Sequence, residues 1–258
     1  MLMAKARLHT FGLYEIFWCS MSNENIQSAA VTFAKENRKR IAKELTDPNK
    51  YQPDELPVSV FMADSPGAGK TEFSKNIISI LEEGRNHEVI RIDGDDVRIL
   101  LPGYTGNNSH LFQGAVSLIV EKIHDFVLSQ KQSFVLDGTF SRYEKAVDNI
   151  KRSLDKGRRV FIFYVYQNPE TAWRFTKQRE KVEGRNIPKE SFVEQFFGAK
   201  ETVNRVLREY NEKVVVFLVK KDFEKNTVDE VVKIESHGHL VDEYIKERYT
   251  KDILQSIL

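Results

Sequence analysis

The stretch VSVFMADSPGAGKT, residues 58–71, decides the fold class that this chain is expected to adopt. Its first five residues, Val58 to Met62, form a short apolar run typical of a buried strand. A glycine-containing turn follows, and beyond it apolar residues recur on one face of an expected helix, at Phe73, Ile77, Ile78 and Leu81. A strand, a glycine-rich turn and a helix in this order are the context in which a phosphate-binding loop occurs.

The turn carries the residue types that a polyphosphate requires. Glycine lets the backbone turn tightly and aim its N–H groups at phosphate oxygens, and the helix that begins near Lys70 adds the positive end of its dipole. Lys70 is expected to reach the β- and γ-phosphates, and the hydroxyl of Thr71 is expected to bind Mg²⁺. The sequence therefore predicts a site for ATP or GTP with Mg²⁺, formed by Pro66, Gly67, Ala68, Gly69, Lys70 and Thr71.

One position departs from the phosphate-loop pattern G-x-x-x-x-G-K-[ST]. The first glycine of the pattern is replaced by Asp64. A carboxylate at this position either repels phosphate and crowds the strand end, or points away toward a neighbouring loop. Because Gly67, Gly69, Lys70 and Thr71 all agree with the pattern, nucleotide binding is expected, and the alternative is a glycine-rich turn without chemical meaning.

The rest of the chain alternates apolar strand-like runs with amphipathic helical segments. Such alternation predicts a P-loop NTPase-type α/β fold, in which a doubly wound parallel sheet of about five strands is flanked by helices. An extra N-terminal helix is expected over residues 23–46, and Asn168-Pro169 has the residue types of a helix start. The five expected strands span residues 58–62, 89–92, 133–136, 160–165 and 214–219, and a last helix is expected from about residue 238.

Composition excludes several classes of protein. The 258 residues, 41% of them apolar, suffice for one α/β domain with extensions. The 39 basic and 38 acidic residues nearly cancel, so nucleic acid is not expected as a partner. The single cysteine, Cys19, excludes a disulfide framework within one chain and fits the reducing cytoplasm. No run of about 18 apolar residues occurs, so no membrane-spanning helix is expected.

Carboxylates are expected at the edge of the sheet where the acceptor of a phosphoryl group would bind. Asp93, Asp95 and Asp96 follow the second expected strand, and Asp137 ends the third. A kinase needs one carboxylate there to take the proton of the acceptor hydroxyl, and Asp95 is the candidate. Asp93 and Asp96 are alternatives for that role or caps of the following helix. Asp137 occupies a position typical of a Mg²⁺ ligand or an acceptor contact, the alternative being a turn-forming Asp-Gly.

A basic segment between Arg174 and Arg185 is expected to neutralise charge during phosphoryl transfer. Arg179 and Arg185 are the candidates, although six residues apart they do not share one face of a regular helix. The break at Gly184 is expected to turn Arg185 back toward the site, whereas Arg174 and Lys177 are expected on a solvated helix face.

Three parts of the chain are expected from these features. Residues 51–258 are expected to form a P-loop kinase domain that ends in a C-terminal helix, and residues 22–50 a helix packed on it. Residues 1–21 form an N-terminal extension whose apolar stretch faintly resembles a signal peptide. Because Met21 opens a polar segment typical of a cytosolic start, this extension is expected to be non-essential or the product of over-extended translation, and the alternative is an interaction helix.

The order of these motifs resembles that of the zeta toxins, also called UDP-N-acetylglucosamine kinases. The motifs are P-x-G-x-G-K-T, I-D-x-D, an acidic residue followed by Gly-Thr at a strand end, a single arginine and R-x-x-P-K. They are found here at Pro66 to Thr71, Ile92 to Asp95, Asp137 to Thr139, Arg179, and Arg185 to Lys189. The resemblance extends from about Val58 to Tyr210, and it also suits the helix before the phosphate loop.

The resemblance implies a mechanism and a partner. Asp95 would be the base acting on a sugar 3′-hydroxyl of UDP-N-acetylhexosamine. Asp137, where the family usually has Glu, and Thr139 would contact that nucleotide sugar, while Arg179 and Arg185 would stabilise the transferred phosphoryl group. Such enzymes are usually toxins of the bacterial cytoplasm, and a small helical antitoxin protein covers their nucleotide site.

Three other functions are compatible with parts of the pattern. Asp95-Asp96-Val97-Arg98 also resembles the D-D-x-R of polynucleotide 5′-hydroxyl kinases, in which the arginine, here Arg98, would bind the substrate. The near-neutral charge argues mildly against that reading. A nucleotide-binding module without turnover is conceivable because of Asp64. A nucleoside-triphosphatase motor has the least support, since no oligomerisation arginine pattern is evident.

Overall fold

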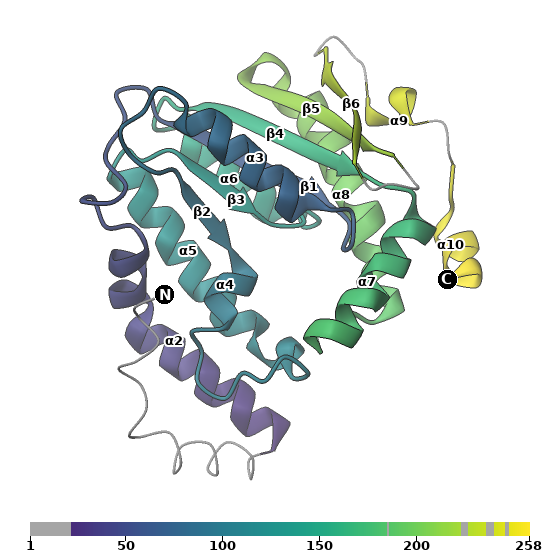
Figure 1. Ribbon diagram of the computed structural model, residues 1–258, viewed down its shortest axis with the longest axis horizontal. Helices are drawn as coiled ribbons and strands as arrows, with labels where there is room; N and C mark the ends of the chain where they lie inside the picture. Colours follow the sequence, from purple (N-terminus) through teal and green to yellow (C-terminus); the bar gives the residue numbers. More distant parts are fainter. Residues whose placement is uncertain (1–21, 185, 223–226, 236–239, 246–247) are drawn as a thin grey trace.

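The molecule is built on one mixed sheet of six strands in the order β2-β3-β1-β4-β5-β6 (Figure 1). The computed structural model describes residues 22–184, 186–222, 227–235, 240–245 and 248–258. The strands are β1 (Val58–Asp64), β2 (Ile90–Asp93), β3 (Phe134–Asp137), β4 (Arg159–Tyr166), β5 (Val214–Lys221) and β6 (Val228–Ile234). The first five run parallel, as expected, and β6 is antiparallel to β5.

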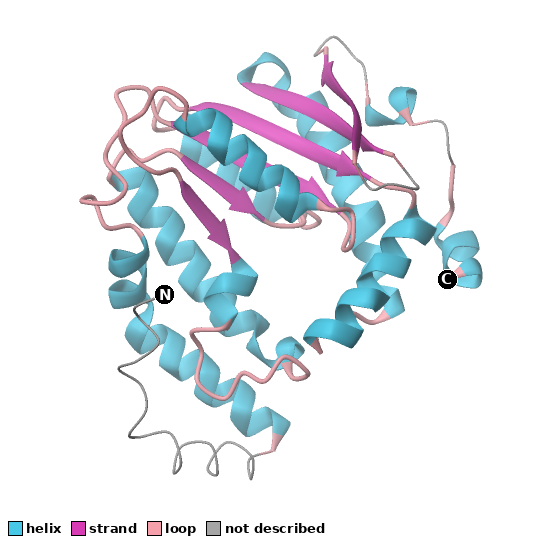
Figure 2. Cartoon of the chain, in the orientation of Figure 1, coloured by secondary structure: helices cyan, strands magenta, loops and turns pink. Residues whose placement is uncertain are grey.

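Helices cover the two faces of the sheet unequally (Figures 1 and 2). On one face α3 (Lys70–Glu82) buries Phe73 and Ile77 against Val60 and Met62 of β1. The opposite face is covered by a larger cluster with α5 and α8. The remaining helices are α2 (Asn23–Leu45), α4 (Gly94–Arg98), α5 (Gln113–Ser129), α6 (Tyr143–Leu154), α7 (Pro169–Glu183), α8 (Lys189–Tyr210), α9 (Val241–Tyr244) and α10 (Lys251–Ile257), with 3₁₀ turns at Ser109–Phe112 and Asn211–Lys213.

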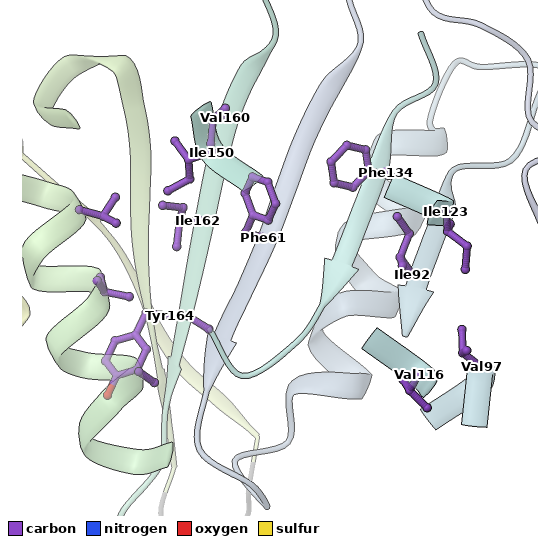
Figure 3. Packing of buried hydrophobic residues seen from close by; sticks show 14 of the residues in the cluster. Phe61, Ile92, Val97, Val116, Ile123, Phe134, Ile150, Val160, Ile162 and Tyr164 are labelled. Atoms are coloured by element: carbon purple, nitrogen blue, oxygen red, sulfur yellow. The ribbon is translucent and has the colours of Figure 1, made fainter. Parts of the chain in front are cut away.

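The alternation of side chains along β1 assigns its residues to these two faces. Phe61 and Ala63 belong to the larger cluster, whereas Val60 and Met62 face α3. Because successive strand residues point to opposite faces, Asp64 at the end of β1 is on the α3 side. Figure 3 shows the larger cluster, in which Phe61 lies close to Phe134 of β3, with ring centroids 5.8 Å apart.

The N-terminal helix expected over 23–46 is present as α2 and packs along α5. The hydroxyl of Ser22 caps its first turn by accepting from the backbone N–H of Asn25. Ala30 and Ala34 on its inner face are fully buried, and their small side chains let the two helices approach closely. This packing closes the face of the sheet that carries the larger cluster.

Two expectations about the C-terminal part require correction. A sixth strand, β6, was not expected, because Asp229, Glu230 and Lys233 interrupt its apolar residues, as is common in exposed edge strands. The single last helix expected from about residue 238 is instead two short helices, α9 and α10. The backbone of Ile245 is extended after α9, and Thr250 starts a new helix by accepting from the N–H of Ile253. Residues 1–21, including Cys19, lie outside the described residues.

Within the described ranges, none of the helices combines the length and the hydropathy that crossing a lipid bilayer would require.

A buried histidine makes the stability of this core depend on pH. His124 of α5 is 1% exposed and packs edge-on against the rings of Phe61 and Phe134. Burial, and next the charge of Arg152, lowers the pKa of His124 to about 3. Since the ordinary value is 6.5, folding favours the neutral ring, and its stabilisation is complete above pH 6.5 and lost as the pH falls toward 3.

We expect His124→Phe to reduce the acid sensitivity of folding. Between pH 6 and 4 the free energy of unfolding of the wild type should fall more steeply than that of the variant, by about 1.4 kcal/mol per pH unit. Urea unfolding followed by circular dichroism at several pH values measures both slopes. Equal slopes would show that His124 accepts a proton in the folded state.

Candidate active site

Three aspartates end three neighbouring strands. Asp93 of β2 is directly opposite Asp137 of β3 in the parallel register. Asp64 ends β1, and its backbone N–H donates to the carbonyl oxygen of Thr139, just beyond β3, at 3.2 Å. Because the carboxyl ends of parallel strands meet at one edge of a sheet, the order β2-β3-β1 brings the three carboxylates together where ligands bind in open α/β sheets.

The phosphate loop, residues 64–71, connects β1 to α3 at this edge. Gly67 and Gly69 have φ angles of +79° and +80°, in the left-handed region that glycine adopts without strain. Gly69 is the N-cap of α3, so the loop ends where the positive end of the helix dipole begins. A side chain at Gly67 would also collide with α7, since an added Cβ would lie 2.0 Å from the carbonyl oxygen of Ala172 and 2.6 Å from Thr176 Oγ1.

Lys70, the first residue of α3, lies between two carboxylates. Its Nζ is 3.1 Å from Oδ1 of Asp64 and 3.5 Å from Oδ1 of Asp137. All three side chains are shielded from water, with exposed fractions of 16% for Lys70, 3% for Asp64 and 0% for Asp137. The departure noted in the sequence therefore has a structural consequence, because Asp64 points toward the phosphate-loop lysine.

This arrangement shifts the protonation of its members. Burial raises the pKa of Asp64 to about 7, against the attraction of Lys70, and the charges of Asp137 and Asp93 add to the rise. Burial alone would lower the pKa of Lys70, but Asp64 and Asp137 together raise it above its ordinary value. The pKa of Asp93 is raised as well, by burial and then by the charge of Asp137. The lysine thus stays charged, and the aspartates compete for it.

Asp137 is held by two further side chains. Its Oδ2 accepts from the hydroxyl of Ser74 at 2.8 Å and from Nε of Arg91 at 2.9 Å. Arg91 of β2 also pairs with Asp93 and, at 2.8 Å, with Asp96, so one guanidinium links three carboxylates. Sequence reasoning missed both Ser74 and Arg91. Arg91 carried a signal, because the two-residue period of a strand places Arg91 and Asp93 on the same side.

Asp95 lies in the first turn of α4, next to this network. Oδ1 of Asp93 caps the helix by accepting from the backbone N–H of Asp95 at 2.8 Å. The guanidinium of Arg98 pairs with Oδ1 of Asp95 and donates to Oε1 of Gln113 at 3.1 Å. The Asp95 side chain is 37% exposed, whereas that of Arg98 is only 5% exposed. Asp95 is thus oriented by the buried guanidinium of Arg98, and its carboxylate is still accessible to a ligand.

The loop after β3 presents two hydroxyl groups. Oγ1 of Thr139 and Oγ of Ser141 lie 3.0 Å apart. Between them Phe140 has a φ of +58°, which is uncommon for a residue with a side chain and marks local backbone strain. The loop packs tightly on α8, since a Cβ added at Gly198 would lie 2.7 Å from the carbonyl oxygen of Ser141. Ser141 was not among the residues expected at the site.

The basic segment is only partly described. Arg179 is an exposed residue of α7, whereas Arg185 lies outside the described residues. Helix α7 ends at Gly184, and an added Cβ there would lie 2.7 Å from Oδ1 of Asn107. The C-terminal end of α7, the helix that carries Arg179, therefore adjoins the loop that follows α4.

The residues present fit a nucleotide with its magnesium ion. Oδ1 of Asp137 is buried and accepts no hydrogen bond within the described part of the chain, and its one ionic contact there is Lys70 at 3.5 Å, so this carboxylate oxygen could also take a cation. The described residues contain no group of three His, Cys, Asp or Glu side chains arranged to bind a metal by themselves. Mg²⁺ usually takes one or two protein ligands and completes its shell with phosphate and water. Thr71 and Asp137 would supply those protein ligands.

A mostly parallel sheet with a glycine-rich loop after β1 and a lysine at the start of the next helix defines the P-loop fold class. A model of the zeta toxin family matches residues 41–232, which is most of the chain. The chain belongs to the zeta toxin family, so the resemblance noted in the sequence is confirmed.

Solved structures of a toxin–antitoxin system and of a second two-protein complex share the fold. The PezAT chromosomal toxin–antitoxin system of the human pathogen Streptococcus pneumoniae matches with a TM-score of 0.58 and 16% identity, over 87% of this chain and 86% of that chain. The native AvrRxo1-ORF1:-ORF2 complex matches with a TM-score of 0.55 and 16% identity, over 88% and 68%. A structure of the same complex with ATP gives 0.55 and 15%, over 86% and 69%. No curated protein sequence matches the chain.

We expect Gly67→Ala to lower the free energy of unfolding by about 3 kcal/mol. The substitution adds strain at positive φ, about 1 kcal/mol, to a collision with α7 that overpacking data place at about 1–3 kcal/mol. Gly84→Ala is the matched control, because Gly84 has a φ of +75° and nothing within 4 Å of an added Cβ. Urea unfolding measures both variants. Equal losses would mean that α7 does not press on the phosphate loop.

Proposed function

We propose that this protein transfers the γ-phosphoryl group of ATP or GTP to a sugar hydroxyl of a nucleotide sugar of the UDP-N-acetylglucosamine type. The observation that carries this proposal is the proximity of the phosphate loop to an accessible aspartate. Lys70 contacts Asp137, Arg91 joins Asp137 to Asp93, and Asp93 caps α4, the helix that carries Asp95 in its first turn. A phosphate donor and a hydroxyl acceptor can therefore be bound at one sheet edge.

The donor side is supported by the loop and by a structural relative. The backbone N–H groups of the phosphate loop and the α3 dipole favour an anion at this end of the sheet. The AvrRxo1-ORF1:-ORF2 complex has been solved with ATP. Thr71 and Asp137 would hold Mg²⁺, which neutralises phosphate charge when bound.

Asp95 is the proposed general base. Its carboxylate would accept the proton of the acceptor hydroxyl while the hydroxyl oxygen forms a bond to the γ-phosphorus. In the same step the bond between the γ-phosphorus and the β–γ bridging oxygen breaks, and the nucleoside diphosphate leaves. Arg98 keeps Asp95 in position through their ion pair, and the exposed fraction of Asp95 allows direct contact with the acceptor.

The remaining candidates surround this reaction. Lys70, and Arg179 from α7, would compensate the charge that spreads over the phosphoryl oxygens, with Arg185 as a further candidate. Thr139 would contact the acceptor from the loop after β3, together with Ser141. Asp137 has one oxygen committed to Ser74 and Arg91, so it would serve the acceptor or Mg²⁺ through the other.

The geometry gives less support to a polynucleotide 5′-kinase. In that reading Arg98 would bind a substrate phosphate, yet the Arg98 side chain is 5% exposed and is engaged by Asp95 and Gln113. We therefore assign Arg98 to positioning Asp95 rather than to binding the acceptor.

The biological role that we propose is that of the toxin in a toxin–antitoxin pair acting in the bacterial cytoplasm. Membership of the zeta toxin family and the likeness to the PezAT toxin–antitoxin system support a toxin role and a small antitoxin protein as partner. The reaction itself supports the cytoplasm, where ATP and nucleotide sugars are both present.

We expect Asp95→Asn to reduce phosphoryl transfer by about 10²–10⁴-fold, because the amide cannot accept the hydroxyl proton. Its affinity for nucleotide should stay close to that of the wild type, since Asp95 lies on the acceptor side. The measurement is mass spectrometry of nucleotide sugars incubated with the protein, ATP and Mg²⁺, with nucleotide affinity determined separately by calorimetry. Lys70→Ala should remove transfer and also weaken nucleotide binding.

Asp96→Asn is the matched comparison for Asp95→Asn. Asp96 is the neighbouring carboxylate on the same helix, but it pairs with Arg91 and is 64% exposed. Its amide variant should keep most of the activity. Normal turnover by Asp95→Asn, or a larger loss in Asp96→Asn, would reject Asp95 as the base. Nucleotide binding without any phosphorylated sugar would reject the proposed acceptor class.

Expression of the wild-type chain in bacteria should stop growth, whereas expression of Lys70→Ala to the same level should not. The physical reason is that toxicity in this proposal requires phosphoryl transfer, and the variant lacks the cation that binds the phosphates. Growth curves after induction, with immunoblots to equalise the protein level, measure the effect. Equal growth arrest by both forms would show that toxicity does not depend on the phosphate loop.

A further inference from the structure

The residue that breaks the phosphate-loop pattern is also the one that contacts the loop lysine most closely. Oδ1 of Asp64 is 3.1 Å from Nζ of Lys70 and accepts no hydrogen bond of good geometry. Among the described residues, Lys70 provides the one cationic group within 4 Å of this carboxylate. Asp137, in contrast, also has Ser74 and Arg91 as partners.

Asp64 cannot leave this position without moving the centre of the sheet. It ends β1, which lies between β3 and β4, and it pairs with Val165 of β4 in the parallel register. Its backbone N–H donates to the carbonyl oxygen of Thr139, and the residue is 2% exposed. The carboxylate is therefore held on the α3 side at the base of the phosphate loop, and it cannot follow Lys70 if the lysine turns toward a bound phosphate.

The carboxylates around Lys70 outnumber its single positive charge, which disfavours a further anion at this position. Two carboxylates, Asp64 and Asp137, face one ammonium group at 3.1 and 3.5 Å. Burial raises the pKa of Asp64, and one further charged group, Asp93 of β2, adds to this rise. Burial, and in turn the charge of Asp64, raises the pKa of the Tyr164 hydroxyl of β4. Arg91 compensates Asp137 and Asp93 but is not paired with Asp64. A triphosphate must therefore compete with Asp64 for Lys70.

We propose that Asp64 is the counter-ion of Lys70 in the nucleotide-free protein and that it thereby lowers the affinity for nucleotide. This inference rests on the proposed function, since it takes the phosphate loop to be the nucleotide site. In a loop with glycine at this position, the lysine has no such competitor. Here part of the attraction between Lys70 and the β- and γ-phosphates is offset by loss of the Asp64 contact.

A buried charge pair has two measurable consequences. Removing the carboxylate frees Lys70 for phosphate, which should tighten binding of Mg²⁺-ADP and of a non-hydrolysable ATP analogue. The interaction is also present without ligand, so replacing either partner should remove the same contact from the free protein. The pKa of Asp64, raised to about 7, indicates that burial opposes its charge and that Lys70 supports it.

The experiment compares Asp64→Asn, which keeps the shape of the side chain, with Asp64→Gly, which restores the residue of the pattern. Both should bind Mg²⁺-ADP about tenfold tighter than the wild type in calorimetry. Asp242→Asn is the matched control, because Asp242 also pairs with a lysine, Lys200, at 2.8 Å, but does so between α8 and α9. Its affinity for nucleotide should not change.

A double-mutant cycle on the free protein provides the second readout. Asp64→Asn, Lys70→Met and the double variant are unfolded in urea without nucleotide, and their effects should not be additive. Additive effects would overturn the proposal, and so would unchanged or weaker nucleotide binding by Asp64→Asn. Tighter binding by Asp64→Gly alone would assign the effect to crowding and reject a counter-ion. None of these results depends on the acceptor, so failure to phosphorylate a sugar would reject the proposed kinase activity alone.

Discussion

The parallel order β2-β3-β1 is the constraint on which the site depends. It places Asp93, Asp137 and Asp64 at adjacent strand ends. Along the chain, α3 separates Asp64 from Asp93, and α5 lies between Asp93 and Asp137. No local pattern requires these carboxylates to meet. They meet because each ends a strand and because parallel strands end at one edge. The same edge receives the N-termini of α3 and α4, which begin with Lys70 and Gly94.

Carboxylates this close together repel one another, and the repulsion is compensated by a few basic side chains. Arg91 links Asp93, Asp96 and Asp137, Arg98 pairs with Asp95, and Lys70 contacts both Asp64 and Asp137. Buried ion pairs contribute little net stability when complete, but removal of one partner leaves a costly unpaired charge. The network is therefore better understood as a device that fixes side-chain positions than as a source of stability.

Prediction from sequence succeeded where the determinants are local. The phosphate loop, the five parallel strands and the helix start at Asn168-Pro169 follow from short patterns that the structure confirms. The contacts that define the site are not local: Arg91 and Asp137 are 46 residues apart. Similarly, Gly67 touches α7, more than a hundred residues later. The edge strand β6 escaped prediction because its charged residues obscure the strand pattern.

Gly67 packs directly against the first turns of α7, so the phosphate loop and the helix that carries Arg179 are in close steric contact. There is no room for even a methyl group between them, so the loop cannot move closer to the helix unless the helix also moves. A displacement of α7 toward the sheet would accordingly press on the backbone of the phosphate loop. The sequence positions of these two segments are thus linked sterically, since only a residue without a side chain lets them pack at this distance.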